Sequence, residues 1–146
     1  MPLTGTFQRT LDDKQRLAIP KRFRDLLVEE DERLLFLAPE TDQSLALYAP
    51  RRFEERATLF ANDPSGRSEA RVYQRLYYSQ AEGVELDAQG RIRLPERLIK
   101  FARLQQDVVL IGVNDHVELW DRGIWEQFLE AHGPTFDQLA SDAFGR

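Results

Sequence analysis

Residues 11–22 read LDDKQRLAIPKR, and residues 86–97, which lie 75 positions later, read LDAQGRIRLPER. Five of the twelve aligned positions are identical, and two more exchange one aliphatic side chain for another. Likeness at this level, in the same order, indicates an internal duplication. The chain is therefore expected to contain two copies of one structural unit.

Each copy predicts a strand, a tight turn, a second strand and a short helix. The carboxylate of Asp12 or Asp87 can accept hydrogen bonds from amides one or two residues ahead, which closes a turn. Residues alternate after the turn, so Arg16 and Arg91 are expected on the face opposite the aliphatic side chains. Proline then fixes φ at the first helical position, and a brief amphipathic segment follows in both copies.

The two turns differ at one position, where the second copy has Gly90 and the first has Gln15. Glycine takes a positive φ without steric cost, whereas a residue with a side chain pays about 1 kcal/mol or more. If residue 15 has positive φ, we expect Gln15→Gly to be neutral or stabilising. Otherwise the first turn has a different geometry from the second.

The pattern L-D-x-x-x-R-apolar-x-apolar-P, present twice, resembles the MraZ family of bacterial transcriptional regulators, whose two halves each carry a DxxxR signature. The resemblance covers nearly the whole chain, and Gln15 departs from the glycine that is frequent in the family. It implies an α+β fold: an internally duplicated, swapped-hairpin β-barrel of the AbrB type with flanking short helices. It also implies a ring-shaped homo-oligomer that binds repeated promoter elements of the division and cell-wall gene cluster.

The duplication predicts four segments. They are a first repeat at 1–61, a connecting helix at 62–79, a second repeat at 80–132 and a C-terminal helix or tail at 133–146. The likeness continues to LALY at 45–48 and VELW at 117–120, where the offset falls to 72 because the first copy is three residues longer. The connecting helix carries Arg67, Arg71 and Arg75 on one face. This stripe is either a solvated face or a contact with a subunit or a phosphate.

Composition favours a globular protein. The chain has 146 residues, of which 42% are hydrophobic, and it has no cysteine. Disulfides and thiolate metal sites are thereby excluded, and two histidines far apart in sequence offer little material for a zinc centre. His116 occupies the place of Ser44 in the first copy, and nothing in its neighbourhood predicts a ligand or a base. We expect no cofactor, no metal, no membrane segment and a cytoplasmic location.

The charge is unevenly distributed. The whole chain has a net charge of −5, which on its own argues against nucleic acid, since DNA affinity comes largely from basic groups that meet phosphates. Residues 9–24 carry +4 and residues 87–103 carry +3, which leaves −12 on the remainder. A basic surface on an acidic body can bind DNA, because distant exposed charges are screened beyond about 8–10 Å at physiological salt.

The motif arginines are the best candidates for contact with DNA. Arg16 and Arg91 follow a turn at the same place in both copies, and a guanidinium can contact a phosphate or guanine O6 and N7. The alternative is that they are exposed strand residues that keep the sheet soluble. The full predicted set comprises Arg16, Arg91, Lys14, Arg9 and Arg93 as DNA-binding residues, with Asp12 and Asp87 as the residues that orient the loops.

Three classes of function remain to be compared. The leading hypothesis is a sequence-specific regulator that binds double-stranded promoter DNA and associates with the nucleoid. The alternative is an antitoxin-like or scaffold module with the same fold, in which the arginines bind an acidic protein. An enzyme is disfavoured because no metal set, phosphate-binding glycine loop or nucleophile constellation is present, so no catalytic residue is predicted.

Overall fold

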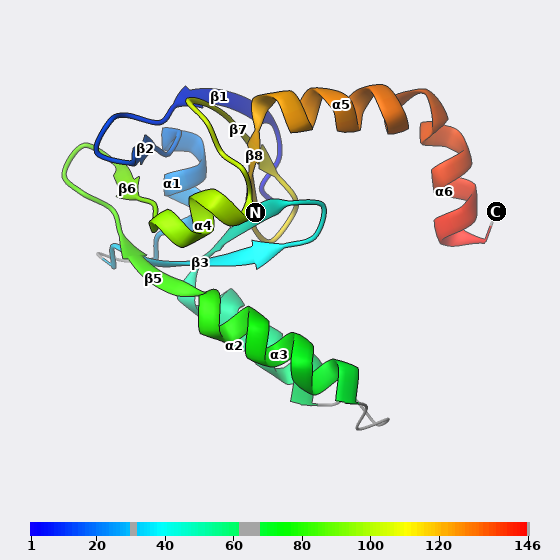
Figure 1. Ribbon diagram of the computed structural model, residues 1–146, viewed down its shortest axis with the longest axis horizontal. Coiled ribbons are helices and arrows are strands. Elements are labelled where there is room, and N and C mark those ends of the chain that lie inside the picture. The colour runs from blue at the N-terminus through cyan, green and yellow to red at the C-terminus, as the bar shows by residue number, and fades with distance from the viewer. Residues whose placement is uncertain (30–31, 62–67, 146) are drawn as a thin grey trace.

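The computed structural model describes residues 1–29, 32–61 and 68–145 (Figure 1). The strands are β1 (Thr6–Thr10), β2 (Arg16–Ala18), β3 (Leu34–Glu40), β4 (Ser44–Tyr48), β5 (Glu82–Glu85), β6 (Arg91–Arg93), β7 (Asp107–Gly112) and β8 (Val117–Asp121). The helices are α1 (Lys21–Leu27), α2 (Pro50–Ala61), α3 (Ser68–Gln80), α4 (Glu96–Phe101), α5 (Arg122–His132) and α6 (Phe136–Phe144). The order strand, strand, helix, strand, strand, helix occurs twice, which agrees with the predicted duplication.

The strands form two antiparallel sheets in which the repeats exchange partners. The larger sheet has the order β1-β7-β8-β4-β3-β5, and the smaller one pairs β2 with β6. Strand β1 of the first repeat therefore pairs with β7 of the second, while β5 of the second pairs with β3 of the first. Exchanging the repeats leaves both strand orders unchanged. This arrangement confirms the swapped-hairpin α+β fold.

The strand registers confirm the sequence alignment of the two copies. Leu17 lies opposite Ile92 in the β2–β6 pair, and these positions are equivalent at an offset of 75. Ala46 lies opposite Glu118 in the β4–β8 pair, where the equivalent offset is 72. Each pair therefore lies on the same approximate twofold axis that relates the repeats. The three extra residues of the first copy fall between these two points.

One large apolar core lies between the two sheets and the short helices. Its fully buried members come from both repeats and include Leu17 and Ile92 of the ribbon and Phe23 and Leu98 of α1 and α4. Mutual burial explains how two units of about 70 residues form a stable protein, because each alone would be marginal. Two large aromatic side chains of the central strands are also buried, since Tyr48 is fully buried and Trp120 is 3% exposed.

The strands do not form the closed barrel that the resemblance implied. Among the described residues, the six-stranded sheet is open, and the β2–β6 ribbon is a separate sheet of three-residue strands. Pro20 and Pro95 lie two residues past the ends of β2 and β6, and proline lacks the N–H that would extend the ladder further. The ribbon therefore ends where α1 and α4 begin, before it can join the larger sheet through continuous pairing.

The helices that flank the core extend in different directions. Helices α2 and α3 form a hairpin on one side of the molecule, and α5 and α6 extend on another (Figure 1). The predicted connecting helix at 62–79 corresponds to α3. The first six residues of that prediction, which include Arg67 of the arginine stripe, lie outside the described residues. Among the described helices, none has the length and apolar character to cross a membrane.

Candidate nucleic-acid interface

The first motif turn is held together by the carboxylate of Asp12. Its Oδ1 accepts hydrogen bonds from the backbone amides of Lys14, at 2.9 Å, and Arg16, at 2.8 Å. Its Oδ2 accepts a third bond from Nε of Arg16 at 2.8 Å. The backbone closes the same turn, because the Gln15 amide donates to the Asp12 carbonyl at 3.0 Å. One carboxylate thus fixes both the loop and the side chain that follows it.

The second turn repeats these contacts. Oδ1 of Asp87 accepts from the amides of Gln89 and Arg91, both at 2.9 Å, and Oδ2 accepts from Nε of Arg91 at 2.9 Å. The Gly90 amide donates to the Asp87 carbonyl at 3.0 Å. Arg91 has one further bond, from Nη2 to Oε1 of Gln89 at 2.9 Å. The two motifs therefore adopt the same local path, as the sequence alignment predicts.

Both turns require a left-handed residue and an ionised carboxylate. Gln15 has φ +63° and Gly90 has φ +76°. Gln15 therefore takes the left-handed conformation of the second turn although it carries a side chain, which makes that conformation costly. The backbone hydrogen bond from the Arg16 amide, together with the bond from its side chain, lowers the pKa of Asp12. The amide and side chain of Arg91 lower the pKa of Asp87 in the same way. Both carboxylates consequently remain charged at neutral pH and hold their arginines.

The β2–β6 ribbon brings arginines of both repeats to one face. Arg16 lies opposite Arg93, and Ala18 lies opposite Arg91, while Leu17 and Ile92 between them are buried on the other face. Arg93 is exposed, and the other two arginines are half-buried. The two motif turns lie at the same side of the molecule (Figure 1). The ribbon and its loops thus present three arginines together.

The remaining predicted basic residues lie in two different places. Lys14 is exposed in the first turn, next to the ribbon. Arg9 lies on β1, where its Nη1 donates to the carbonyl of Gln8 at 2.8 Å and its guanidinium lies 5.7 Å from the centre of the Phe7 ring. The structure therefore groups Lys14 with the ribbon and places Arg9 on the neighbouring sheet.

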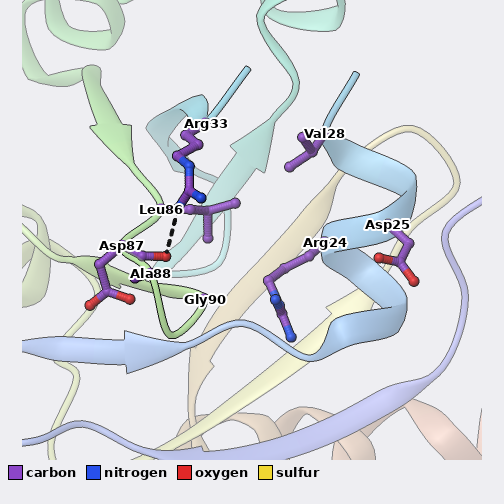
Figure 2. Close-up of a pocket in the computed structure, with 8 residues that line it drawn as sticks. All are labelled: Arg24, Asp25, Val28, Arg33, Leu86, Asp87, Ala88 and Gly90. Atoms are coloured by element: carbon purple, nitrogen blue, oxygen red, sulfur yellow. Dashed lines mark hydrogen bonds between the residues drawn. The ribbon is translucent and has the colours of Figure 1, made fainter. Parts of the chain in front are cut away.

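Two further arginines, which are not in the predicted DNA-binding set, flank the second turn. Arg24 and Arg33 of the first repeat line a shallow groove that also contains Asp87 and Gly90 (Figure 2). Nη1 of Arg33 donates to the Asp87 carbonyl at 3.2 Å, and Nε of Arg24 donates to the carbonyl of Ile19 at 3.0 Å. The Arg33 bond joins the two repeats, and Arg24, whose own bond stays within the first repeat, lies beside Gly90 of the second. Local sequence patterns carry no signal for them, because they depend on the exchange of strands.

A separate group of side chains has the chemistry of metal ligands. Glu40, His116 and Glu118 offer ligand atoms that all lie within 4.8 Å of one another. They lie at the junction of the repeats and belong to neither motif turn. No sequence pattern groups these residues, since Glu40 and His116 belong to different copies.

Comparison with known proteins identifies the family. The model of the family described as "MraZ protein, putative antitoxin-like" matches the chain twice, over residues 3–76 and 77–146. "Transcriptional regulator MraZ" of Mycoplasmoides gallisepticum (strain R(low / passage 15 / clone 2)) is 36% identical over 136 residues, which cover 93% of each chain. The protein of the same name from Moorella thermoacetica (strain ATCC 39073 / JCM 9320) is 36% identical over 136 residues, which are 93% of this chain and 92% of the relative. This chain, with its paired Asp–Arg turns and exchanged strands, belongs to the MraZ family, a family of transcriptional regulators and not of enzymes.

Proposed function

We propose that the chain regulates transcription by binding double-stranded promoter DNA through the β2–β6 ribbon and the two motif turns. The observation that carries this proposal is the grouping of Arg16, Arg91 and Arg93 on one face of the ribbon. The major groove of B-DNA, about 12 Å wide, admits a two-stranded β-ribbon, and arginine can contact phosphates or donate two bonds to guanine. Such a regulator works in the cytoplasm, in association with the nucleoid.

The Asp–Arg pairs explain how the contacts could be selective. A long side chain loses conformational entropy when it binds, and this cost falls when the guanidinium is already oriented. Asp12 and Asp87 hold Nε of Arg16 and Arg91, which directs each planar guanidinium. In this proposal the aspartates orient the loops and do not contact DNA, because a carboxylate is repelled by phosphate.

The target is a set of repeated promoter elements of the division and cell-wall gene cluster, bound by a ring-shaped homo-oligomer. A single chain with a few basic contacts binds weakly at physiological salt. An oligomer that spans several elements makes later contacts intramolecular, with gains of about 10²–10⁴ in affinity. Assembly is supported by large apolar side chains that are exposed on α6, including Phe136 at 72% and Phe144 at 78%.

The test is the double variant Arg16→Ala/Arg91→Ala, titrated against duplexes with one, two and four promoter repeats. We expect a sharp loss of promoter binding, with an unchanged elution volume in size-exclusion chromatography because neither side chain belongs to the apolar core. The matched control is Arg51→Ala/Arg52→Ala, which removes two exposed arginines of α2 away from the ribbon. Undiminished binding by the first variant would overturn the DNA surface, and equal affinity for one and four repeats would overturn the role of assembly.

A protein-interaction module is the second candidate, because the matched family model is described as antitoxin-like. In that case the ribbon arginines bind an acidic protein. The discriminating measurement compares the chain's own upstream promoter DNA with random duplex in a gel-shift assay. Equal binding to both, or none to either, would favour the second candidate.

A further inference from the structure

The junction of the two repeats contains a histidine between carboxylates. Glu40 ends β3 of the first repeat, while His116 and Glu118 lie at the start of β8 of the second. Their ligand atoms lie within 4.8 Å of one another, and His116 is only 9% exposed. The side chain of Glu118 is 15% exposed. Imidazole and carboxylate are ligands that Zn²⁺ accepts, at about 2.0–2.2 Å from the metal.

The contacts of His116 resemble those of a histidine that binds a metal. Its Nδ1 lies 2.7 Å from Oδ1 of Asp115, and its Nε2 lies 3.0 Å from Oε2 of Glu118. A histidine ligand usually donates its second ring N–H to a carboxylate, which fixes the tautomer and the orientation of the ring. Asp115 is placed to accept that proton at Nδ1. Nε2, which lies against Glu118, is then the nitrogen left to coordinate an ion.

The hydroxyl of Tyr48 is a second and independent observation. This side chain is fully buried, and its oxygen has no hydrogen-bond partner among the residues that the structure describes. The Tyr48 ring lies 5.1 Å from the His116 ring. Burial raises the pKa of Tyr48, against the opposing effect of the Arg56 guanidinium, which lies 5.2 Å from the centre of the ring. A buried polar group without a partner costs free energy, and an ion beside it is one of the recognised explanations.

Comparison of the repeats shows that the fold does not require this cluster. The approximate twofold axis places Ser44 at the position of His116 and Ala46 at that of Glu118. Ser44 is fully buried and donates to the carbonyl of Thr41 at 2.8 Å, so the equivalent place is filled without any ionisable group. The two carboxylates and the histidine therefore serve something other than the packing that the two repeats share.

We propose that Glu40, His116 and Glu118 form a site for a divalent transition metal of the Zn²⁺ type. The combination of one imidazole with carboxylates favours such an ion over Mg²⁺ or Ca²⁺, which take oxygen ligands alone. Glu40 belongs to the first repeat and the other two ligands belong to the second, so the ion links the repeats. A metal that binds only the folded chain stabilises it in proportion to the logarithm of its concentration.

The experiment measures thermal unfolding of the full chain after treatment with EDTA, with and without ZnCl₂, together with the stoichiometry by isothermal titration calorimetry. We expect one Zn²⁺ per chain and a rise in Tm that EDTA reverses. Glu40→Gln should abolish the rise while it preserves the shape of the side chain and the contact between His116 and Glu118. Asp115→Asn should weaken Zn²⁺ binding by about 10–100-fold, because it removes the partner of the ligating ring.

The matched control is His132→Gln, which changes the second of the two histidines, at the end of α5. This variant should bind Zn²⁺ as the unaltered chain does. The proposal is overturned if ZnCl₂ does not raise the Tm of the unaltered chain, if Glu40→Gln retains the full rise, or if His132→Gln loses it. None of these outcomes depends on DNA, so they leave the proposed transcriptional function untouched.

Discussion

The two repeats have the same turns but different surroundings. Asp12 and Asp87 accept equivalent sets of three hydrogen bonds, and the arginine four residues after each aspartate is half-buried. Outside the turns, Arg24 and Arg33 of the first repeat flank the second turn, whereas the equivalent positions around the first turn are Ile99 and Gln106. The same local geometry forms in two different environments, so the hydrogen bonds within each Asp–Arg turn are sufficient to specify it.

The sheet edges differ as well. The N–H of Gly112, at the end of β7, donates to the carbonyl of Gly5 at 2.9 Å, and the amide of Leu3 donates to the carbonyl of Asn114 at 2.8 Å. The equivalent position at the end of β3 is Pro39, which has no N–H to offer. The first repeat therefore extends the edge of the second with its N-terminal segment, and the opposite edge has no such extension among the described residues.

The largest expected effect on stability comes from a substitution that disturbs the N-terminal extension of the β7 edge. A Cβ at Gly112 would lie 2.5 Å from the Thr4 nitrogen and 2.6 Å from the Leu3 carbonyl carbon, both of which are backbone atoms. Gly112→Ala must therefore displace the N-terminal segment, and we expect it to lower the free energy of unfolding by about 1–3 kcal/mol. Urea unfolding followed by circular dichroism measures the change.

Gly133→Ala is the control for that substitution. Gly133 has φ −53°, and a Cβ there would meet no atom within 4 Å, so alanine should be neutral or slightly stabilising. Equal midpoints for the two variants would show that the N-terminal segment adapts to alanine without cost. The edge of β7 would then not depend on glycine.

A smaller effect, of opposite sign in the two repeats, is expected at the left-handed position of the turns. Gln15→Gly should be neutral or stabilising by up to about 1 kcal/mol, because φ +63° is costly for a residue with a side chain. Gly90→Ala should lose about 1 kcal/mol, since it acquires that cost and its Cβ would lie 2.7 Å from the Arg24 guanidinium. Denaturation midpoints of both variants provide the measurement.

Ala88→Gly controls for the general effect of glycine in these turns. Ala88 has no positive φ, so glycine should destabilise there by about 0.4–1 kcal/mol through the greater freedom of the unfolded chain. A clear loss of stability in Gln15→Gly would mean that the Gln15 side chain stabilises the turn by more than its backbone strain costs.

The turns could be predicted from the sequence because their hydrogen bonds are local. Strand pairing and contacts between distant residues could not be predicted from local patterns. The bonds from Asp12 to the amides ahead of it connect residues at most four apart, so the sequence specifies them directly. The exchange of strands between repeats came from the family resemblance, since periodicity identifies a strand but not its partner. The strands do not close into a barrel, because the β2–β6 ribbon is a sheet of its own, separate from the six-stranded one.

The candidate sites show the same limit. Arg16 and Arg91 could be predicted because each follows its own turn, while their grouping with Arg93 depends on the β2–β6 register. The Arg24 contact with the second turn and the Glu40–His116 cluster bring together residues that are far apart in the chain. The domain limits at 61, 79 and 132 and the DNA contacts themselves stay predictions.

The smallest expected effect concerns the difference in charge between the two ends of the β2–β6 ribbon. Its two ends are the pair Arg16 with Arg93 and the pair Arg91 with Ala18, and Ala18 is the counterpart of Arg93 in the duplication. If the ribbon contacts DNA, one end offers two basic groups and the other offers one. The protein then has a preferred direction on DNA even though its fold is nearly symmetric.

Ala18→Arg makes the two ends of the ribbon alike. Ala18 is only partly buried, so the longer side chain can extend into solvent, and folding should be unaffected. One added phosphate contact should steepen the dependence of log affinity on log salt by about 0.9, because one more counterion is released. Ala57→Arg, at an exposed position of α2, adds the same charge away from the ribbon and should leave the slope unchanged. Fluorescence anisotropy with promoter DNA at several salt concentrations measures both slopes. An equal slope for Ala18→Arg and the unaltered chain would mean that this end of the ribbon points away from DNA, and the contact surface would then be confined to Arg16, Arg93 and the turns.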